Sequence, residues 1–194
     1  MKRVCLLMTL VCMMLVSFKP DGSDVKHEGH GYVDLGLSVK WATCNVGATS
    51  PEDFGHCFAW GETSPKDEYT EDNCSIYGKQ MNDISGNPQY DAATANWGGD
   101  WRMPTEYECD ELIDKCKWVW VTVNGVEGCK VTGPNGNSIF LPAGWWNAEY
   151  WSSESCRYYL NNHLYASYLY FDSDRQGTYC LPCCDGKFVR PVVE

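Results

Sequence analysis

Between residues 33 and 40, apolar and polar side chains alternate along the chain. The apolar positions are Val33, Leu35, Leu37 and Val39, and the polar or small ones are Asp34, Gly36, Ser38 and Lys40. A period of two predicts an extended strand with one face in the core. We therefore expect a strand pair in "YVDLGLSVKWATCNVG", residues 32–47, and a short apolar strand in "CFAWGE", residues 57–62. Residues 62–96 are rich in Asp, Asn, Ser, Pro and Gly, which predicts a long excursion.

The period changes in "RMPTEYECDELIDKC", residues 102–116. Thr105 followed by Glu108 forms a capping box, in which each side chain satisfies a backbone N–H at a helix start. The apolar residues after it are spaced as one face of a helix: Cys109, Leu112, Ile113 and Cys116. We expect Cys109 and Cys116 to point into the core or toward a core disulfide.

After this helix the pattern is typical of short strands and turns. "WVWVTV" meets Asn124-Gly125, the strongest short hairpin signal, and returns through "VEGCKVTG". "PNGN" predicts a turn into "SIFLPAG", and further strands are expected in "YWSSES", "YYLNN", "ASYLYFD" and "KFVRPVV". One main helix with several short antiparallel strands and long loops predicts an α+β domain. No repeat at a fixed period is visible.

The first residues have the order of a secretory signal. Lys2 and Arg3 precede an apolar run from Val4 to Phe18, which is short for a membrane span. We predict a signal peptide over 1–18, a polar linker over 19–31 and one domain over 32–194, in a protein that is secreted or held at the cell surface. A retained anchor is the alternative. Export makes disulfides expected, and removal of the leader leaves ten of the twelve cysteines.

The net charge of −11 limits the partners. No basic stripe offsets it, so nucleic acid and anionic lipid should be repelled. We expect neither nucleic-acid binding nor specific binding to membrane lipids.

Six motifs occur in an order that resembles a known family: "YVDLGLSVKWATCNVGA", "FAWGE", "YDAATANWGGDWRMPTEYE", "VTGPNGNSIFLPA", "YWSSES" and "VRPV". Together they resemble the Fibrobacter succinogenes major paralogous domain, which is common in exported proteins of gut bacteria, over residues 32–192. "WRMPTEYE" is also similar to the "RLPTEAEWE" signature of formylglycine-generating-enzyme-like proteins. Both groups are similar to the C-type-lectin fold, in which terminal strands pair and a long loop region carries the ligand site. The resemblance implies a non-catalytic binding module.

The late cysteines of "CLPCC" are candidates for a chemical site. Structural zinc usually needs a second ligand pair at a defined spacing, and none follows Cys180, Cys183 and Cys184 in the sequence. A redox pair normally begins a helix, and here the flanks predict turns and strands. Calcium-binding runs of lectins are missing from the sequence. We predict neither a metal nor a cofactor. The alternatives are a formylglycine-generating-type enzyme that uses the late cysteines, or a structural pilus subunit.

The C-terminal third predicts a recognition surface. In "ASYLYFDSD", Leu169 and Phe171 alternate with tyrosines and Asp172, so the polar set should face outward if the apolar pair faces the core. Tyrosine offers a large contact area at little cost in rotamer entropy. We predict tyrosines as stacking platforms, with Asp and Arg as orienting groups, for a protein or carbohydrate ligand on a cell, phage or host surface. The candidate ligand-binding residues are Trp146, Tyr168, Tyr170, Asp172, Arg175, Gly177, Tyr179, Cys180, Leu181 and Asp185.

Residues 156–185 also have a restricted vocabulary. They contain no Lys, Glu, Met or Trp, and Gln176 is their one Gln. These are the residue types that no codon ending in cytosine encodes. Diversity-generating retroelements alter the adenines of AAC-type codons, which end in cytosine. Their targets resemble C-type-lectin-fold proteins with a variable patch before a fixed C-terminal strand. The segment is therefore a hypothetical variable region, and chance composition is the alternative.

Overall fold

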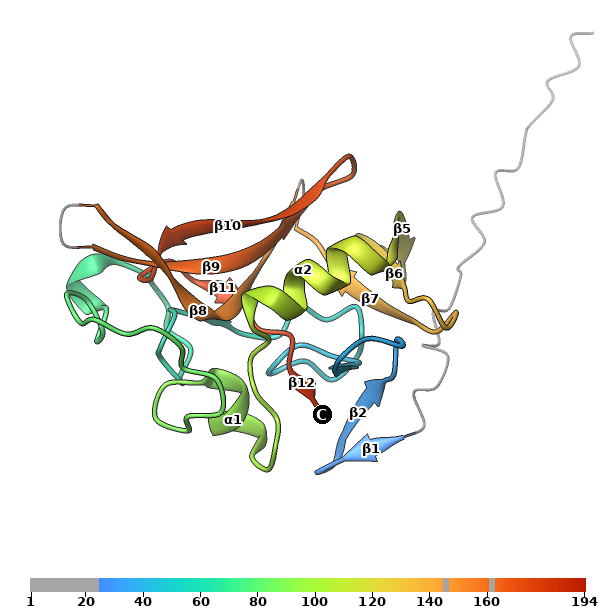
Figure 1. Ribbon diagram of the computed structural model, residues 1–194, viewed down its shortest axis with the longest axis horizontal. Helices are drawn as coiled ribbons and strands as arrows, with labels where there is room; N and C mark the ends of the chain where they lie inside the picture. The colour runs from blue at the N-terminus through green and yellow to red at the C-terminus, as the bar shows by residue number, and fades with distance from the viewer. Residues whose placement is uncertain (1–24, 145–146, 161–162) are drawn as a thin grey trace, which may run out of the picture.

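The computed structural model describes residues 25–144, 147–160 and 163–194. These residues form an α+β fold dominated by sheet, as the sequence predicts, with two α-helices where one main helix was expected (Figure 1). The helical elements are η1 (Glu71–Asn73), α1 (Ala92–Trp97) and α2 (Glu106–Lys115). The strands are β1 (Lys26–His27), β2 (His30–Val33), β3 (Lys40–Ala42), β4 (Cys57–Phe58), β5 (Lys117–Val123), β6 (Val126–Thr132), β7 (Ser138–Pro142), β8 (Ala148–Leu160), β9 (His163–Phe171), β10 (Gln176–Pro182), β11 (Lys187–Phe188) and β12 (Val192–Val193).

The strands are arranged in three sheets. The sheet orders are β1-β2-β3-β12, β10-β9-β8-β11-β4 and β5-β6-β7. Neighbouring strands are antiparallel except for β11 beside β8, where Phe188 lies opposite Tyr150 in a parallel pair. The five-stranded sheet carries six of the ten candidate ligand-binding residues, all of them in β9 and β10, and Asp172 and Arg175 lie between these two strands.

The alternating pattern near the N-terminus predicts burial correctly, but the backbone is not one continuous strand. Val33, Leu35 and Val39 are buried, as the period of two requires. Gly36 has φ of +75°, a left-handed conformation that glycine adopts without steric cost, and it interrupts the strand between β2 and β3. Residues 26–31, assigned to the linker by composition, take part in the β1–β2 hairpin.

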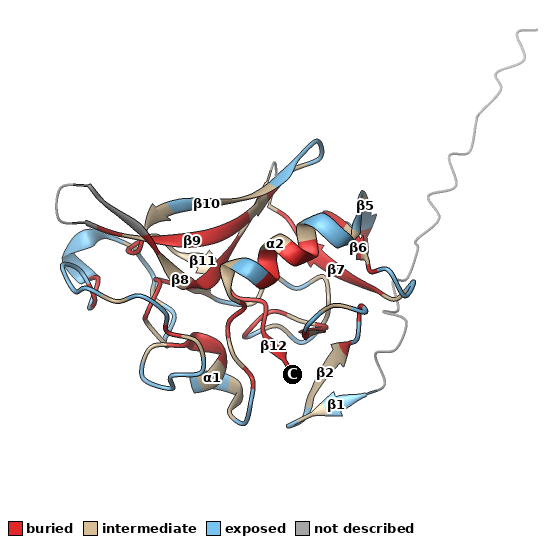
Figure 2. Ribbon diagram, in the orientation of Figure 1, coloured by how far each residue is buried: buried red, intermediate tan, exposed pale blue. Residues whose placement is uncertain are grey.

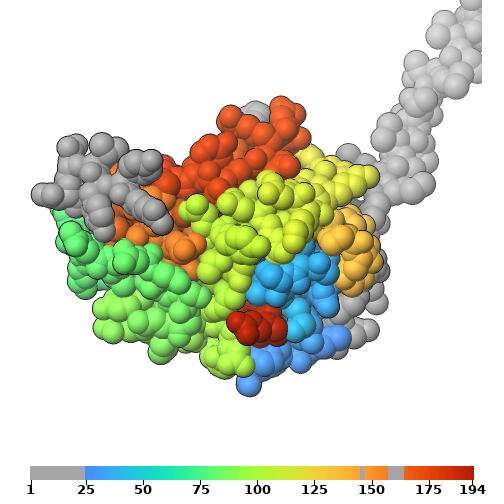
Figure 3. Space-filling view, viewed as in Figure 1, coloured from blue at the N-terminus to red at the C-terminus, as the bar shows by residue number. Residues whose placement is uncertain are grey.

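The two ends of the described chain meet in one sheet. β12 pairs with β3, so that Val192 lies opposite Trp41. Figure 3 shows the last residues, in dark red, lying beside the blue N-terminal strands. Arg190, 1% exposed, is directed inward and donates to the Asn45 side chain and to two backbone carbonyls, Ala42 O and Phe140 O. The C-terminal segment is therefore part of the scaffold.

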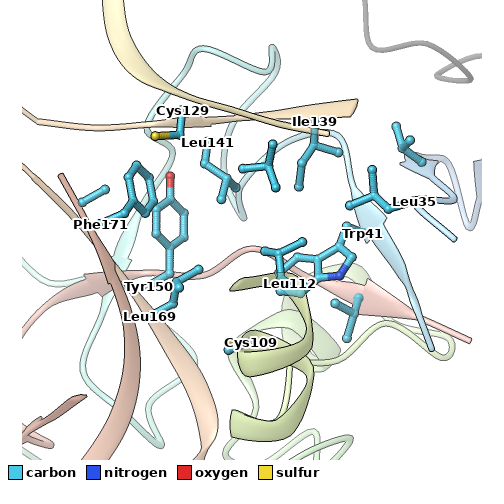
Figure 4. Close-up of a cluster of buried hydrophobic side chains, with 14 of the residues drawn as sticks. Leu35, Trp41, Cys109, Leu112, Cys129, Ile139, Leu141, Tyr150, Leu169 and Phe171 are labelled. Atoms are coloured by element: carbon cyan, nitrogen blue, oxygen red, sulfur yellow. The ribbon is translucent and has the colours of Figure 1, made fainter. Parts of the chain in front are cut away.

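Helix α2 begins and packs as its sequence predicts. The Thr105 side chain accepts from the Glu108 N–H, and the Glu108 carboxylate accepts from the Thr105 N–H. Cys109 and Leu112 are buried in the main core, and Cys116 packs against it from the helix end. Figure 4 shows the helix residues facing Leu169, Phe171 and other apolar side chains of the sheets. Both helix cysteines are free thiols, so the core expectation holds and no core disulfide forms between them.

The predicted excursion over 62–96 contains structure that its composition did not reveal. Asp91 caps α1 by accepting from the Ala93 and Thr94 N–H groups, and Ile76, Ile84 and Ala93 are buried. These residues form a second core cluster with Trp151, Tyr168 and other side chains of the five-stranded sheet. The sheet is therefore packed on both faces, with α2 on one and this excursion on the other. As a consequence of this packing on both faces, β9 is almost wholly buried (Figure 2).

The hairpin predictions after α2 are confirmed. Asn124 and Gly125 have φ of +48° and +87°, the left-handed pair that a two-residue turn requires between β5 and β6. β7 follows the predicted second turn and is buried at all of its positions. Among the helices of the described residues, none is both long and apolar enough to cross a membrane.

Candidate functional site

Three tyrosines are brought together where β9 and β10 pair. Tyr168 lies directly opposite Tyr179, and Tyr170 lies opposite Gly177, so the three rings share one side of the sheet, called here the tyrosine face. The Tyr179 ring lies 5.7 Å from that of Tyr170 at an interplanar angle of 88° and 6.2 Å from that of Tyr168 at 41°. Edge-to-face aromatic pairs of this kind stabilise each other beyond simple burial. The tyrosines predicted from sequence spacing therefore do form one cluster.

Asp172 organises the end of this cluster next to the β9–β10 turn. Its carboxylate accepts from the Asp174 and Arg175 N–H groups, from the Tyr170 hydroxyl at 2.8 Å and from the Arg175 Nε at 3.2 Å. The Arg175 guanidinium also lies 5.3 Å from the centre of the Tyr170 ring, within cation–π range. The hydrogen bond from the Asp174 N–H, followed by that from Tyr170, lowers the pKa of Asp172 to about 2. Asp172 is thus ionised and held in a fixed orientation.

Tyr168 corrects the expectation that all the tyrosines face solvent. It is 8% exposed and its ring meets that of Trp151 at 6.2 Å, whereas Tyr179 is 46% exposed. The alternation along β9 holds, but the second core cluster covers the sheet where Tyr168 lies. Burial, followed by the charge of Glu149, raises the pKa of Tyr168 to about 12. Tyr168 forms the buried part of the tyrosine face, and Tyr170 and Tyr179 form its accessible part.

Ion pairs border the tyrosine face on its β8 side. Lys187 Nζ lies 2.6 Å from the Glu149 carboxylate and 3.7 Å from that of Asp185. Glu149 lies opposite Tyr170 in the sheet register, so these charges flank the aromatic cluster. The ion pair with Lys187 therefore holds Asp185, a predicted ligand-binding residue, beside the tyrosine face. The spacing of residues in the sequence did not reveal this pair. Glu149 and Lys187 were missed, although the alternation of Glu149 with buried Tyr150 is a signal for Glu149.

Gly177 and Leu181 lie on the same side of β10 as Tyr179, two positions away in each direction. A Cβ atom at Gly177 would come within 3.1 Å of the Tyr179 ring, so glycine lets the ring lie against the backbone. Leu181 is half-buried and packs against the second core cluster. Gly177 thus shapes the face, while Leu181 contributes mainly to its support.

Cys180, a predicted ligand contact, is part of a disulfide. It forms a disulfide with Cys156 and so joins β10 to β8. Its side chain alternates with that of Tyr179 and lies on the other side of the strand, the side on which Thr178 donates to Asp110 of α2. The prediction of a disulfide is therefore confirmed, and this disulfide involves Cys180, which is exposed. Trp146 lies outside the described residues.

A second cluster consists of three thiols and is called here the thiol cluster. Cys74 follows η1, and Cys183 and Cys184 follow β10; all three are buried and their sulfur atoms lie within 4.8 Å of one another. A hydrogen bond from the Cys183 thiol lowers the pKa of Cys74 to about 6, while the same contact together with burial raises the pKa of Cys183. The sequence shows only the adjacent pair, because Cys74 lies 109 residues before Cys183.

Comparisons of the chain with models of protein families, with curated proteins and with solved structures find no match.

Proposed function

We propose that the chain is an exported, non-catalytic ligand-binding protein that binds a protein or carbohydrate on a cell, phage or host surface through its tyrosine face. The observation that carries the proposal is the joining of Tyr170, Asp172, Arg175 and Tyr179 into one surface cluster. Two rings supply contact area, the exposed guanidinium supplies hydrogen-bond donors, and the carboxylate holds Tyr170 and Arg175 in a fixed orientation. Tyrosine and arginine are the residue types enriched where binding energy concentrates.

We also propose that the fold is C-type-lectin-like. Two features support this: the terminal strands pair through β3 and β12, and a long excursion with little regular structure precedes α2. The resemblance of the motifs to the Fibrobacter succinogenes major paralogous domain supports it independently. In such a fold the ligand site belongs to the loop region and the strands next to it, where the tyrosine face lies.

A binding role fits the late cysteines better than an oxidase or hydrolase of the formylglycine-generating type. Such an enzyme requires a reactive, accessible thiol. Cys180 is in a disulfide, and Cys183 and Cys184 are 1% and 4% exposed. Burial raises the pKa of Cys184 to about 12, so its thiol is protonated at neutral pH. No residue of the tyrosine face is a comparable nucleophile.

We further propose that the tyrosine face is a variable surface generated by a retroelement. Its residues belong almost entirely to the segment with the restricted vocabulary, 156–185, whereas Lys187, which pairs with the face, falls outside it. The exposed members of the segment, among them Arg175 and Tyr179, can change with little loss of core packing. Sequencing the gene tests this idea: the codons for Asp172, Arg175 and Tyr179 should end in cytosine, and a near-repeat should lie downstream. Codons that rarely end in cytosine, with no near-repeat, would exclude it.

The binding proposal is tested by screening glycan arrays and surface proteins against the secreted chain and a Tyr170→Ala, Tyr179→Ala double variant. Loss of two central aromatic contacts should weaken binding at least about tenfold, since each is expected to contribute more than about 1 kcal/mol. The matched control is Tyr107→Ala, which removes a 69% exposed tyrosine from α2. Equal binding by the double variant and the wild type would exclude the tyrosine face as the site.

A further inference from the structure

The thiol cluster is built from two segments whose backbones are held on both sides. The Cys74 N–H donates to the Glu71 carbonyl at 3.2 Å, which ends η1. The Cys183 N–H donates to Leu164 O at 3.0 Å, and the Cys183 carbonyl accepts from Trp60 N–H at 2.9 Å. Neither segment needs to move for the three sulfur atoms to meet. Preorganised ligands of this kind reduce the entropic cost of binding an ion.

The spacing of the sulfur atoms fits a shared metal ion. Cys74 Sγ lies 3.9 Å from Cys183 Sγ, and Cys183 Sγ lies 3.8 Å from Cys184 Sγ. Zinc–thiolate bonds of about 2.3 Å at tetrahedral angles place two sulfur atoms about 3.8 Å apart. The third pair, Cys74 Sγ and Cys184 Sγ, lies within 4.8 Å, so the three sulfur atoms can bind one ion with only a small rearrangement. The carboxylates of Glu62 and Glu71 add negative potential at the cluster, which favours a cation.

A disulfide accounts for the cluster less well. Neighbouring residues have Cα atoms about 3.8 Å apart, closer than the usual 4.4–6.8 Å range of a disulfide, so Cys183 and Cys184 are poorly placed to bond to each other. A bond from Cys74 to either of them would leave the third thiol alone in an apolar cluster. Cys156 and Cys180 differ from this cluster because they form a disulfide. Among the described residues, they are not part of a group of three metal-binding side chains within 4.8 Å of one another.

We propose that Cys74, Cys183 and Cys184 bind one Zn²⁺ ion as thiolates, with a solvent molecule as fourth ligand. Soft thiolate ligands select zinc over calcium or magnesium. The ion joins the excursion over 62–96 to the turn that directly follows β10, the strand that carries Tyr179. The bound ion holds these two segments together next to the strand that carries the tyrosine face. The proposal does not depend on the ligand-binding function.

The test uses the full secreted chain, purified without oxygen and freed of metal by a chelator. Cd²⁺, a spectroscopic substitute for Zn²⁺, should bind at one ion per chain with the ultraviolet charge-transfer intensity of three thiolates. Competition with Zn²⁺ should remove that band. Cys74→Ser should weaken binding at least about 100-fold, because loss of an outer-shell partner alone costs about 10–100-fold. The matched control, Cys44→Ser, replaces a free half-buried cysteine elsewhere and should bind like the wild type.

A second measurement needs no variant. Alkylation followed by mass spectrometry should show Zn²⁺ protecting the three cluster cysteines and leaving the reactivity of Cys44 and Cys57 unchanged. The proposal is overturned if the native chain contains a disulfide from Cys74 to Cys183 or Cys184. It is equally overturned if Cd²⁺ binds the Cys74→Ser variant as tightly as the wild type, or if Zn²⁺ protects none of the three cysteines.

Discussion

Replacing Arg190 by methionine should destabilise the fold strongly, because Arg190 is a buried charge whose partners are all neutral. Its Nε, Nη1 and Nη2 atoms donate at 2.7, 3.0 and 3.1 Å to Asn45 Oδ1, Ala42 O and Phe140 O. Burial lowers the pKa of Arg190 from its usual value, a sign of the desolvation cost that these hydrogen bonds offset. Methionine has similar length but no donor, so the substitution removes three buried hydrogen bonds.

The expected size follows from these contacts. Hydrogen bonds from a charged donor contribute about 1.5–3 kcal/mol each, so three of them contribute roughly 4.5–9 kcal/mol. Removing the guanidinium also recovers a desolvation penalty of several kcal/mol. We expect a net loss of about 3–5 kcal/mol in the free energy of unfolding, close to that of breaking a buried ion pair. Arg190→Lys should lose nearly as much, because one ammonium cannot reach three acceptors arranged around a planar fork.

Urea unfolding monitored by tryptophan fluorescence measures this loss as a lower midpoint at constant slope. The matched control is Arg175→Met, in which a side chain that is 67% exposed loses an ion pair that solvent screens; its urea midpoint should stay close to that of the wild type. A change under about 1 kcal/mol in Arg190→Met would refute the reasoning. It would mean that the recovered desolvation energy matches the hydrogen bonds, as it does in some buried ion pairs replaced by apolar residues.

Three smaller predictions concern α2, the disulfide and the tyrosine face. Thr105→Ala removes the capping box and should lower the free energy of unfolding by about 1 kcal/mol, measured by urea unfolding, with m unchanged. Cys156→Ala with Cys180→Ala opens a loop with a sequence separation of 24 and should cost about 3–4 kcal/mol; an unchanged thermal midpoint would contradict it. The folded-state pKa of Asp172, about 2, lies below the unfolded value near 3.9, so the stability from this group is present above pH 4 and is lost as the pH falls through 2. Asp172→Asn should remove that part of the acid dependence, measured by urea unfolding between about pH 2 and pH 5, and the idea fails if the variant and the wild type lose stability in parallel over that range.

Local features of the fold were predictable because their causes lie within a few residues. The Thr105 cap and the Asn124-Gly125 turn depend on backbone groups next to them, and both are present. Helix α1 carried a similar local signal in Asp91, but its length of six residues and its polar surroundings hid it. The burial of Tyr168 had no local cause. It depends on the excursion over 62–96 folding across the sheet.

The candidate site also combines features with a local cause and contacts between distant segments. Alternation along β9 and β10 placed the tyrosines on one side, because a strand has a fixed period. The ion pairs of Lys187 and the meeting of Cys74 with Cys183 join segments far apart in the sequence. Their residue types suggest such contacts, but only the three-dimensional path of the chain selects the partners. Cys180 shows this most clearly, since the sequence could not assign its disulfide partner.

The contacts of the C-terminal segment divide it into a scaffold and a surface, and this division makes the proposed variability physically reasonable. Asp172, Arg175 and Tyr179 make their contacts within the tyrosine face, so substitutions there change surface chemistry while leaving the main core unchanged; Tyr170 also packs against the second core cluster. On the opposite side of the same strands, Leu169 and Phe171 are buried against the core around α2, and Thr178 donates to that helix. The exposed side chains of the tyrosine face, such as Arg175 and Tyr179, can therefore vary without loss of the register that positions them. A protein that must keep one fold while changing its ligand needs this separation within single strands.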